Sequence, residues 1–554
     1  MKLHAWITVL VLLALPAQAQ QAAPPAPAAS AAPPAPAAPP LTAEQAALKA
    51  HVQFLASDAL RGREAGTHDY DVAAEYVAAQ MLAIGLKPGG ERGGWFQPFR
   101  LATYRAAEKA HWTLRRGSRD VPLQFGTDFI NNGGDDSGAF RAEGDIVFAG
   151  YGIVDPQSRY DDYAGLDVRG KIVLIVSGKP KGLSRDVAAH FDDDRNKAQS
   201  ALVRGAAAIV FVETPALRKV IPFEKMVGFY DYPITGWAAP EGATLPSDAT
   251  KMIGAFSMTG AEKLFAGARI RWADVIAAES RGTRMPTGPL VGRLAVATVT
   301  TRSTKDTRNV VGMIEGSDPA LRNQYVVLSA HLDHLGVGKP VNGDAIYNGA
   351  MDNAIGIAEM LEVVRAIQQS GKRPRRSILV LATAAEEKGM FGSAYFARYP
   401  TVPKDAIVAD LNLDMPILTY PLVDLVVQGG DHSSIGQLVA AAARTEGLGV
   451  VPDPEPREMS FVRSDHYSFV KAGIPAVSID TGPGGIGAAA SRKFLDENYH
   501  QPSDQIDLPF DWNSAVKYKH VGLATALALA DADARPVWNK GDFFGTLYGG
   551  VGAQ

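Results

Sequence analysis

The chain has 554 residues, of which 46% are hydrophobic and 21% are charged, a composition typical of a soluble globular protein with several structural units. Its formal net charge of -4 excludes a global electrostatic attraction to nucleic acid or to an acidic membrane surface. It contains no cysteine, which excludes thiol catalysis, disulfides and cysteine-ligated zinc. Any bound metal must therefore be held by His, Asp and Glu.

The first residues, MKLHAWITVLVLLALPAQAQ, have the features of a signal peptide at 1–19. Lys2 gives the positive start, residues 5–15 the short apolar run, and residues 17–19 the small-x-small cleavage site. The run is too short for a transmembrane helix, which needs about 20 apolar residues. No cysteine follows it to carry a lipid anchor, so we expect export to the periplasm or beyond. Residues 20–41 are mostly Ala and Pro and are expected to form a linker or a removable pro-segment.

Ordered structure is expected to begin with two helices that face the core. Thr42 and Gln45 have the spacing of a capping box, which predicts the start of a helix. Three apolar residues then recur on one helical face, namely Leu48, Val52 and Leu55. A second helix is predicted from Asp71 to Ile84 and is ended by Gly85.

Residues 125–284 read as an inserted β-rich domain. Short apolar pieces such as GDIVFAGYGI and GKIVLIVSG are separated by Gly, Asp and Pro, and ALVRGAAAIVFVETP joins a small-residue helix to a strand. Its ionisable residues show no ligand-like clustering, so we expect a structural or access-shaping role. The insertion would divide a catalytic domain into 42–124 and 285–535, followed by a tail at 536–554 for which we predict no function.

The part from 309 to 532 alternates apolar strands with helices. QYVVLSA, RSILVLATA, DAIVADLNL and GIPAVSID are near-continuous apolar runs, as expected of strands that are covered on both faces. A helix is predicted between them at 354–369. The fold class predicted is therefore α/β, a three-layer α/β/α sandwich with a mostly parallel central sheet.

Ligand-type side chains follow the ends of these strands. Polar groups at the carboxyl ends of parallel strands converge on one crevice. The residues in question are His331, Glu386, Glu387 and Asp414 at strand ends, Asp352 at the start of a helix and His500 in a late loop. Bridging and terminal carboxylates with imidazoles are what a pair of divalent cations requires. The sequence thus predicts a two-metal site.

The motifs around these residues resemble those of the co-catalytic zinc aminopeptidases of metallopeptidase family 28. The matching stretches are AHLDHLG, GAMDNAIG, AAEEKGMFGS, NLDM, RSDHYSF and YHQPSD, in the family's order. LASDALRGREAGT and AIGLKPGG look like the N-terminal segment of exported bacterial members. The insertion, DYAGLDVRGKIVLIVSG above all, is similar to a protease-associated domain. The resemblance implies a zinc-exopeptidase fold and two Zn²⁺ ions per chain.

Carried over to this sequence, the resemblance implies specific ligands. His331 and Asp414 would hold one zinc, Glu387 and His500 the other, and Asp352 would bridge both. It also implies a cis peptide between Asp352 and Asn353.

Three further residues receive catalytic roles from the resemblance. Glu386 would be the general base that takes a proton from a metal-bridging water and passes it to the leaving amine. Asp333, two residues beyond His331, is expected to orient that imidazole. Tyr499 resembles a position whose hydroxyl stabilises the oxyanion. We expect structural or supporting roles for His334 and His466, and Arg463 is expected either to touch substrate or to support its loop.

The function expected is that of an exported, zinc-dependent aminopeptidase acting on peptides with a free N-terminus. Two alternatives remain: a carboxypeptidase or dipeptidase of the same family, and an inactive receptor or scaffold with the same fold. Other first-row ions also suit His and carboxylate ligands. No nucleic-acid partner and no stable membrane insertion after signal removal are expected, and the oligomeric state stays open.

Overall fold

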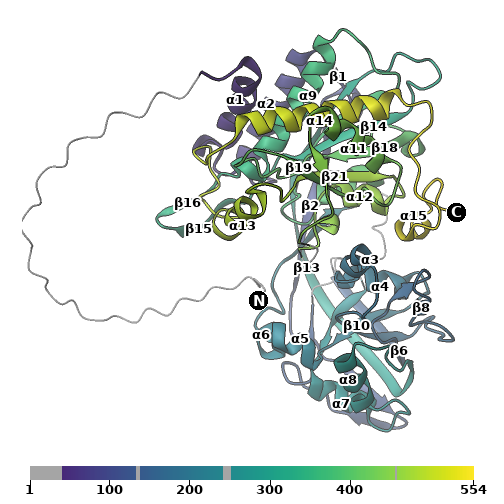
Figure 1. The fold of residues 1–554 in the computed structure, drawn as a ribbon. Coiled ribbons are helices and arrows are strands. Elements are labelled where there is room, and N and C mark those ends of the chain that lie inside the picture. The colour runs from purple at the N-terminus through teal and green to yellow at the C-terminus, as the bar shows by residue number, and fades with distance from the viewer. Residues whose placement is uncertain (1–39, 133–137, 241–250, 456–457) are drawn as a thin grey trace, which may run out of the picture.

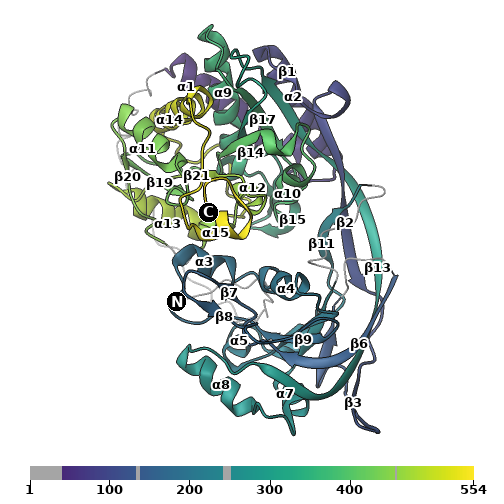
Figure 2. The ribbon, with the colours of Figure 1, turned by 90° about the vertical axis from the view of Figure 1, so that its right-hand side faces the viewer.

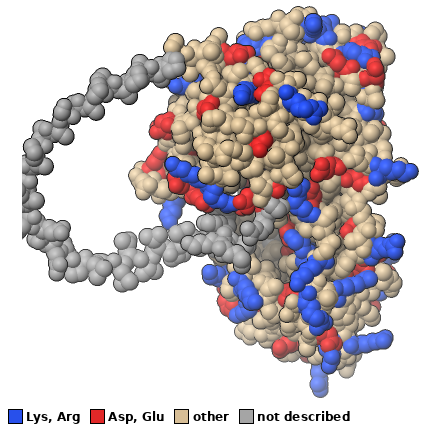
Figure 3. Space-filling model, in the orientation of Figure 1, with Lys and Arg blue, Asp and Glu red and all other residues tan. Residues whose placement is uncertain are grey.

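The computed structural model describes residues 40–132, 138–240, 251–455 and 458–554, so the signal peptide and most of the Ala/Pro segment lie outside the described residues. Two lobes are visible in Figure 1. We call the upper one the body lobe and the lower one, between β3 (Thr113–Arg116) and α8 (Trp272–Arg281), the insertion lobe. Basic and acidic side chains both occur on each lobe of the face in Figure 3. Within the described residues, none of the helices has the length and apolar character needed to cross a membrane.

A mostly parallel sheet forms the centre of the body lobe. β14 pairs in parallel with β17 and β18, and β18 pairs in parallel with β21, while β19 runs antiparallel to β21. The bounds are β17 (Ser377–Thr383), β14 (Tyr325–His331), β18 (Ile407–Asn412), β21 (Ala476–Thr481), β19 (Asp424–Gln428) and the edge strand β20 (Gly449–Val450). The apolar runs of the sequence therefore form the predicted strands, because both faces of this sheet are covered.

Helices cover the two faces of the sheet. Alternate strand residues such as Val326 and Val327 belong to two different apolar clusters, one on each face. The first face is covered by α1 (Ala43–Leu55), α2 (His68–Ile84), α9 (Ile355–Gln369), α11 (Ile435–Thr445) and α14 (Trp512–Asp531). The second is covered by α10 (Phe391–Arg398), α12 (His466–Lys471) and the tail helix α15 (Phe543–Leu547). The three-layer α/β/α sandwich is confirmed.

The first two helices confirm the local predictions closely. Thr42 caps α1 with the capping box that its spacing to Gln45 predicts, and the three apolar residues of its inner face are fully buried. α2 begins three residues earlier than predicted because Thr67, and not a later residue, accepts the N-terminal backbone hydrogen bond. It ends at Gly85, whose φ of 93° suits a residue without a side chain. In Figure 1 the first helix, α1, lies beside the C-terminal helix α14.

The insertion lobe contains its own part of the large sheet, with helices around it. Its strands are β6 (Gly138–Phe148), β9 (Ile172–Val176), β10 (Ala208–Val212), β12 (Met252–Phe256) and β5 (Phe129–Asn131), with β4 (Arg119–Val121) at the edge beside β3. Its helices are α3 (Arg185–His190), α4 (Asp194–Leu202), α5 (Pro215–Val220), α6 (Phe223–Val227), α7 (Met258–Phe265) and α8. The predicted β-rich texture is thus accompanied by a similar share of helix.

One long strand connects the lobes. β13 (Gly288–Ile314) pairs with β6 and β3 in the insertion lobe and with β17 in the body lobe. Between these regions it pairs with β2 (Phe96–Ala106), which also carries β11 (Ile234–Ala238). Figure 2 shows β13 and β2 running along one side of the molecule past the space between the lobes. The two lobes are therefore joined by continuous sheet rather than by a loop.

Candidate metal centre

The predicted ligands come together at the carboxyl edge of the body sheet. β14 ends at His331, β17 leads into Glu386 and Glu387, and β18 leads into Asp414. Asp352 lies in the irregular turn Ala350–Ala354 that opens into α9, and the peptide bond between Asp352 and Asn353 is cis, as the resemblance implies. Parallel pairing places these strand ends side by side, which is why residues far apart in the chain meet.

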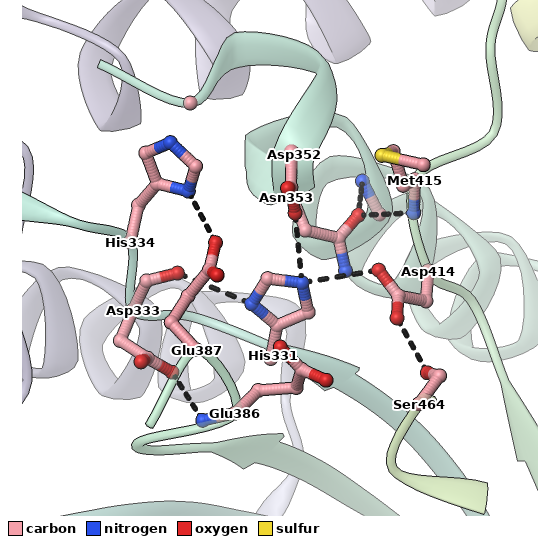
Figure 4. Close-up of polar contacts among 12 residues, drawn as sticks. His331, Asp333, His334, Asp352, Asn353, Glu386, Glu387, Asp414, Met415 and Ser464 are labelled. Carbon is pink, nitrogen blue, oxygen red and sulfur yellow. Dashed lines mark hydrogen bonds and ion pairs between the residues drawn. The ribbon is translucent and has the colours of Figure 1, made fainter. Parts of the chain in front are cut away.

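One group of contacts centres on His331. Its Nε2 lies 3.1 Å from Oδ1 of Asp352 and 3.0 Å from Oδ1 of Asp414. Figure 4 shows the imidazole between these two carboxylates. His331 is 1% exposed and Asp352 is 4% exposed, so these polar groups are buried together.

A second group shares Asp352. His500 Nε2 lies 3.3 Å from the other oxygen of Asp352, Oδ2, and 3.0 Å from Oε2 of Glu387. The two carboxylate oxygens of Asp352 thus face two different imidazoles, one from each group. This is the arrangement that a carboxylate bridging two cations requires.

The donor set fits divalent metal ions such as zinc. Among the described residues, the ligand atoms of His331, Asp352 and Asp414 lie within 4.8 Å of one another, as do those of His334, Asp352 and Glu387. Imidazole nitrogen and carboxylate oxygen are common zinc ligands. Burial alone lowers the pKa of His331, yet the Asp414 and Asp352 carboxylates raise that pKa well above its ordinary value. The centre therefore attracts positive charge, as a cation site must.

Glu386 lies beside this centre without joining the contacts that surround Asp352. Burial raises the pKa of its carboxyl well above the ordinary value, and the negative charges of neighbouring carboxylates act in the same direction. Its backbone N–H donates to Oδ1 of Asp333 over 3.1 Å. His331 Nδ1 contacts the backbone carbonyl of Asp333 at 3.1 Å. We expected Asp333 to orient the imidazole; the structure gives that contact to its main chain, while its carboxylate holds the Glu386 backbone (Figure 4).

Parts of the chain are similar to known proteins. Residues 309–526 match the model of peptidase family M28. This part of the chain belongs to that family. A probable leucine aminopeptidase 2 from Aspergillus oryzae is 28% identical over 218 residues, covering 36% of this chain and 40% of the relative. A probable glutamate carboxypeptidase from Arabidopsis thaliana is 26% identical over 349 residues, covering 56% of this chain and 45% of the relative.

An aminopeptidase structure from Aneurinibacillus sp. strain AM-1 is similar with a TM-score of 0.44 and 20% sequence identity, covering 89% of this chain and 95% of that chain. The chain spans less than half the length of the two curated relatives named above. One of these relatives is named as an aminopeptidase and the other as a carboxypeptidase.

Two residues support the candidate metal centre in ways that the sequence did not specify: His334 was expected only to have a structural or supporting role, and Asp504 was assigned none. His334 Nδ1 lies 2.6 Å from Oε1 of Glu387, so the second histidine of AHLDHLG contacts a predicted ligand. Asp504 accepts hydrogen bonds from the backbone N–H groups of Met351 (2.8 Å) and Asp352 (3.0 Å). It lies in the YHQPSD motif, which was the signal that could have identified it.

Two residues from other motifs also support the candidate metal centre. The fully buried Arg63, from LASDALRGREAGT, donates to the carbonyls of Leu332 (2.7 Å) and Gly349 (2.7 Å), and so ties the segment after His331 to the turn that carries Asp352. Ser464, from RSDHYSF, donates to Oδ2 of Asp414. Backbone and second-layer contacts of this kind fix the orientation of metal ligands.

Of the remaining predicted residues, two contact the candidate metal centre or its neighbours and one is a packing residue. The ring of Tyr499 stacks on His500 with centroids 3.8 Å apart. Arg463 donates to the Tyr499 hydroxyl over 3.5 Å. His466 is fully buried against Phe461, and burial lowers its pKa to about 3, so it is a neutral packing residue and lies outside the described metal-ligand groups.

Proposed function

We propose that this chain is a zinc-dependent aminopeptidase that removes N-terminal residues from peptides. The observation that carries the proposal is the placement of Asp352, whose two oxygens face two separate imidazole and carboxylate groups on the rim of the sheet. His331 and Asp414 would hold one ion, Glu387 and His500 the other, and Asp352 both. When bound, the zinc ions would supply Lewis acidity that polarises the scissile carbonyl and acidifies water.

Glu386 is the proposed general base. Its carboxylate lies within 4.8 Å of ligand atoms of His331 and Glu387 but outside the two groups that contain Asp352, so we assign it to the attacking water rather than to a cation. It takes the proton from the attacking water and returns it to the leaving amine. The hydrogen bond from its backbone to Asp333 holds it at this position.

Tyr499 is the proposed oxyanion donor. Burial raises the pKa of its hydroxyl far above the ordinary value, so the hydroxyl keeps its proton at neutral pH. A protonated hydroxyl beside His500 can donate a hydrogen bond to the oxygen that becomes negative during attack on the carbonyl.

The chain is further proposed to be exported, on the strength of the signal-like segment at 1–19, which lies outside the described residues. We propose that the insertion is a protease-associated domain, because DYAGLDVRGKIVLIVSG is similar to that domain. The proposed division into 42–124 plus 285–535, with 125–284 inserted, follows from the change to short β-rich pieces in the sequence.

Substitution of the base tests the mechanism. Glu386→Gln keeps the shape but cannot accept a proton, so kcat should fall by about 100-fold to 10,000-fold, the usual contribution of general acid–base catalysis. Zinc content, measured by elemental analysis, should stay at that of the unaltered protein. Glu497→Gln, an exposed change on α13 (Gly487–Glu497), is the matched control. Full activity of Glu386→Gln would refute the assignment.

A carboxypeptidase is the second candidate, favoured by the similarity to the plant protein named a probable glutamate carboxypeptidase. An unblocked aminoacyl anilide and an N-acetylated peptide separate the two activities. Hydrolysis of the anilide supports the aminopeptidase, and hydrolysis of only the acetylated peptide supports the carboxypeptidase. Purified protein that binds no zinc and hydrolyses neither substrate would instead be a receptor or scaffold.

A further inference from the structure

Both lobes line the cavity in front of the candidate metal centre. Its volume is about 370 Å³, and one wall contains Glu386, Glu387, Tyr499 and His500. The opposite wall is the turn between α3 and α4 of the insertion lobe, which contributes residues from Ala189 to Asn196. Substrate must therefore fit between the metal ligands and the insertion lobe.

The turn of the insertion lobe is anchored to the body lobe. His190 Nδ1 contacts the hydroxyl of Tyr467 on α12, and the Asn196 side chain donates to the His190 carbonyl over 2.7 Å. Both His190 and Tyr467 are buried, at 2% exposure each. These contacts give the cavity a fixed far wall.

The acidic side chains of that wall are paired with cations. Asp192 contacts Lys179, and Asp193 lies 3.0 Å from Nε of Arg195. Their negative charges are therefore largely neutralised by neighbouring basic groups. Lys471 adds a further positive charge to the lining of the cavity.

Arg463 is paired more loosely than these groups. Its side chain is 50% exposed, and the nearest carboxylate oxygen, from Glu458, is 4.0 Å away. It makes two long hydrogen bonds, to the Glu458 carbonyl at 3.3 Å and to the Tyr499 hydroxyl at 3.5 Å. A guanidinium has five N–H donors in a planar fork that suits a carboxylate. Arg463 lines the cavity, and its contact with Tyr499, which stacks on His500, places it one side chain away from that proposed ligand.

We propose that Arg463 is the anchor of a carboxylate subsite that selects short peptides with an anionic group beside the scissile bond. The inference rests on the proposed peptidase function. A dipeptide extends at most about 3.6 Å per residue, so its C-terminal carboxylate lies one residue beyond the bond that is cut. With the scissile carbonyl at the metal ligands and Tyr499, this carboxylate reaches Arg463. An acidic side chain on the residue after the scissile bond presents the same chemistry.

Matched substrates test the subsite in the zinc-loaded, full-length protein. The free dipeptide Leu-Gly is compared with Leu-Gly amide, which lacks the carboxylate, and Leu-Glu amide is compared with Leu-Gln amide. In one of the two pairs, the unaltered protein should prefer the substrate that carries the carboxylate over the one that lacks it. The expected difference in kcat/KM is about 10-fold to 100-fold, the range of a charge-assisted hydrogen bond. Preference within the first pair identifies the C-terminal carboxylate, and preference within the second identifies an acidic side chain.

The variants then assign the preference to Arg463. In Arg463→Ala the ratio of kcat/KM within the preferred pair should fall to near one, mainly through KM, and Arg463→Lys should restore part of it because a point charge replaces the fork. Arg119→Ala, on the exposed hairpin of β3 and β4, should keep the full ratio. No preference in the unaltered protein, or a preference that survives in Arg463→Ala, overturns the inference. Failure to hydrolyse any of the four substrates rejects the proposed function itself.

Discussion

A partly buried ion cluster joins three distant segments of the chain and predicts a pH-dependent stability. His432, between β19 and α11 of the body lobe, contacts Asp186 of α3 at 3.0 Å and Asp542 of the tail at 2.6 Å. Both ring nitrogens face carboxylates, so the ring is doubly protonated and donates to each. Arg185 also pairs with Asp186, and Phe461 and Phe544 pack against the ring.

The size of the effect follows from the pKa of His432. Burial alone lowers this pKa, but the hydrogen bonds to Asp186 and Asp542 raise it from 6.5 to about 9. Since one pKa unit corresponds to about 1.4 kcal/mol, the contacts stabilise the folded chain by about 3 kcal/mol. Because the folded-state pKa is raised, this contribution is fully present below pH 6.5 and is lost as the pH rises through about 9.

Thermal unfolding of His432→Gln measures this contribution. A loss of about 3 kcal/mol should lower Tm by several degrees at pH 6.5, at roughly 2–4 °C per kcal/mol for domains of moderate size. The difference from the unaltered protein should shrink steadily toward pH 9.5. His111→Gln, at an exposed position, is the control and should behave like the unaltered protein throughout. A Tm difference that stays constant from pH 6.5 to pH 9.5 would refute the reasoning.

Two predictions concern the metal centre. Asp504→Asn replaces a carboxylate that accepts two backbone hydrogen bonds with a group that can accept at only one oxygen, so zinc affinity should fall by about 10-fold to 100-fold in a competition titration with a chromophoric chelator. The exposed change Asp507→Asn should leave the zinc affinity unaltered. Equal zinc affinities for both variants would contradict the supporting role of Asp504. Chelation should lower Tm, and added zinc should restore it, because a ligand that binds only the folded state stabilises that state. Identical Tm values with and without chelator would exclude metal at this centre.

Local sequence patterns identified much of the structure because they act over a few residues. The capping box at Thr42 and the glycine at the end of α2 predicted two helix ends, and apolar runs predicted the central strands. The start of α2 was placed three residues too late because the cap at Thr67, whose side chain accepts from the backbone of Tyr70, was not recognised. The backbone geometry that makes Thr67 the cap is not visible in the sequence.

The contacts that cross between motifs required the coordinates. Neither the contact of His334 with Glu387 nor the role of Arg63 follows from spacing, because each joins residues separated by long stretches of chain. The metal-ligand roles proposed for His331, Asp352, Glu387, Asp414 and His500 stay predictions, although the structure brings these side chains together.

By itself the sequence determined the chemical inventory of this protein: no cysteine, carboxylates and imidazoles at strand ends, and the alternation of strand and helix that brings such ends to one edge. Only the tertiary structure decided what faces that edge. The insertion lobe forms the far wall of the cavity, β13 runs through both lobes, and the tail contacts His432. Such contacts depend on how whole lobes pack, which is set by summed surface complementarity rather than by any local pattern of residues.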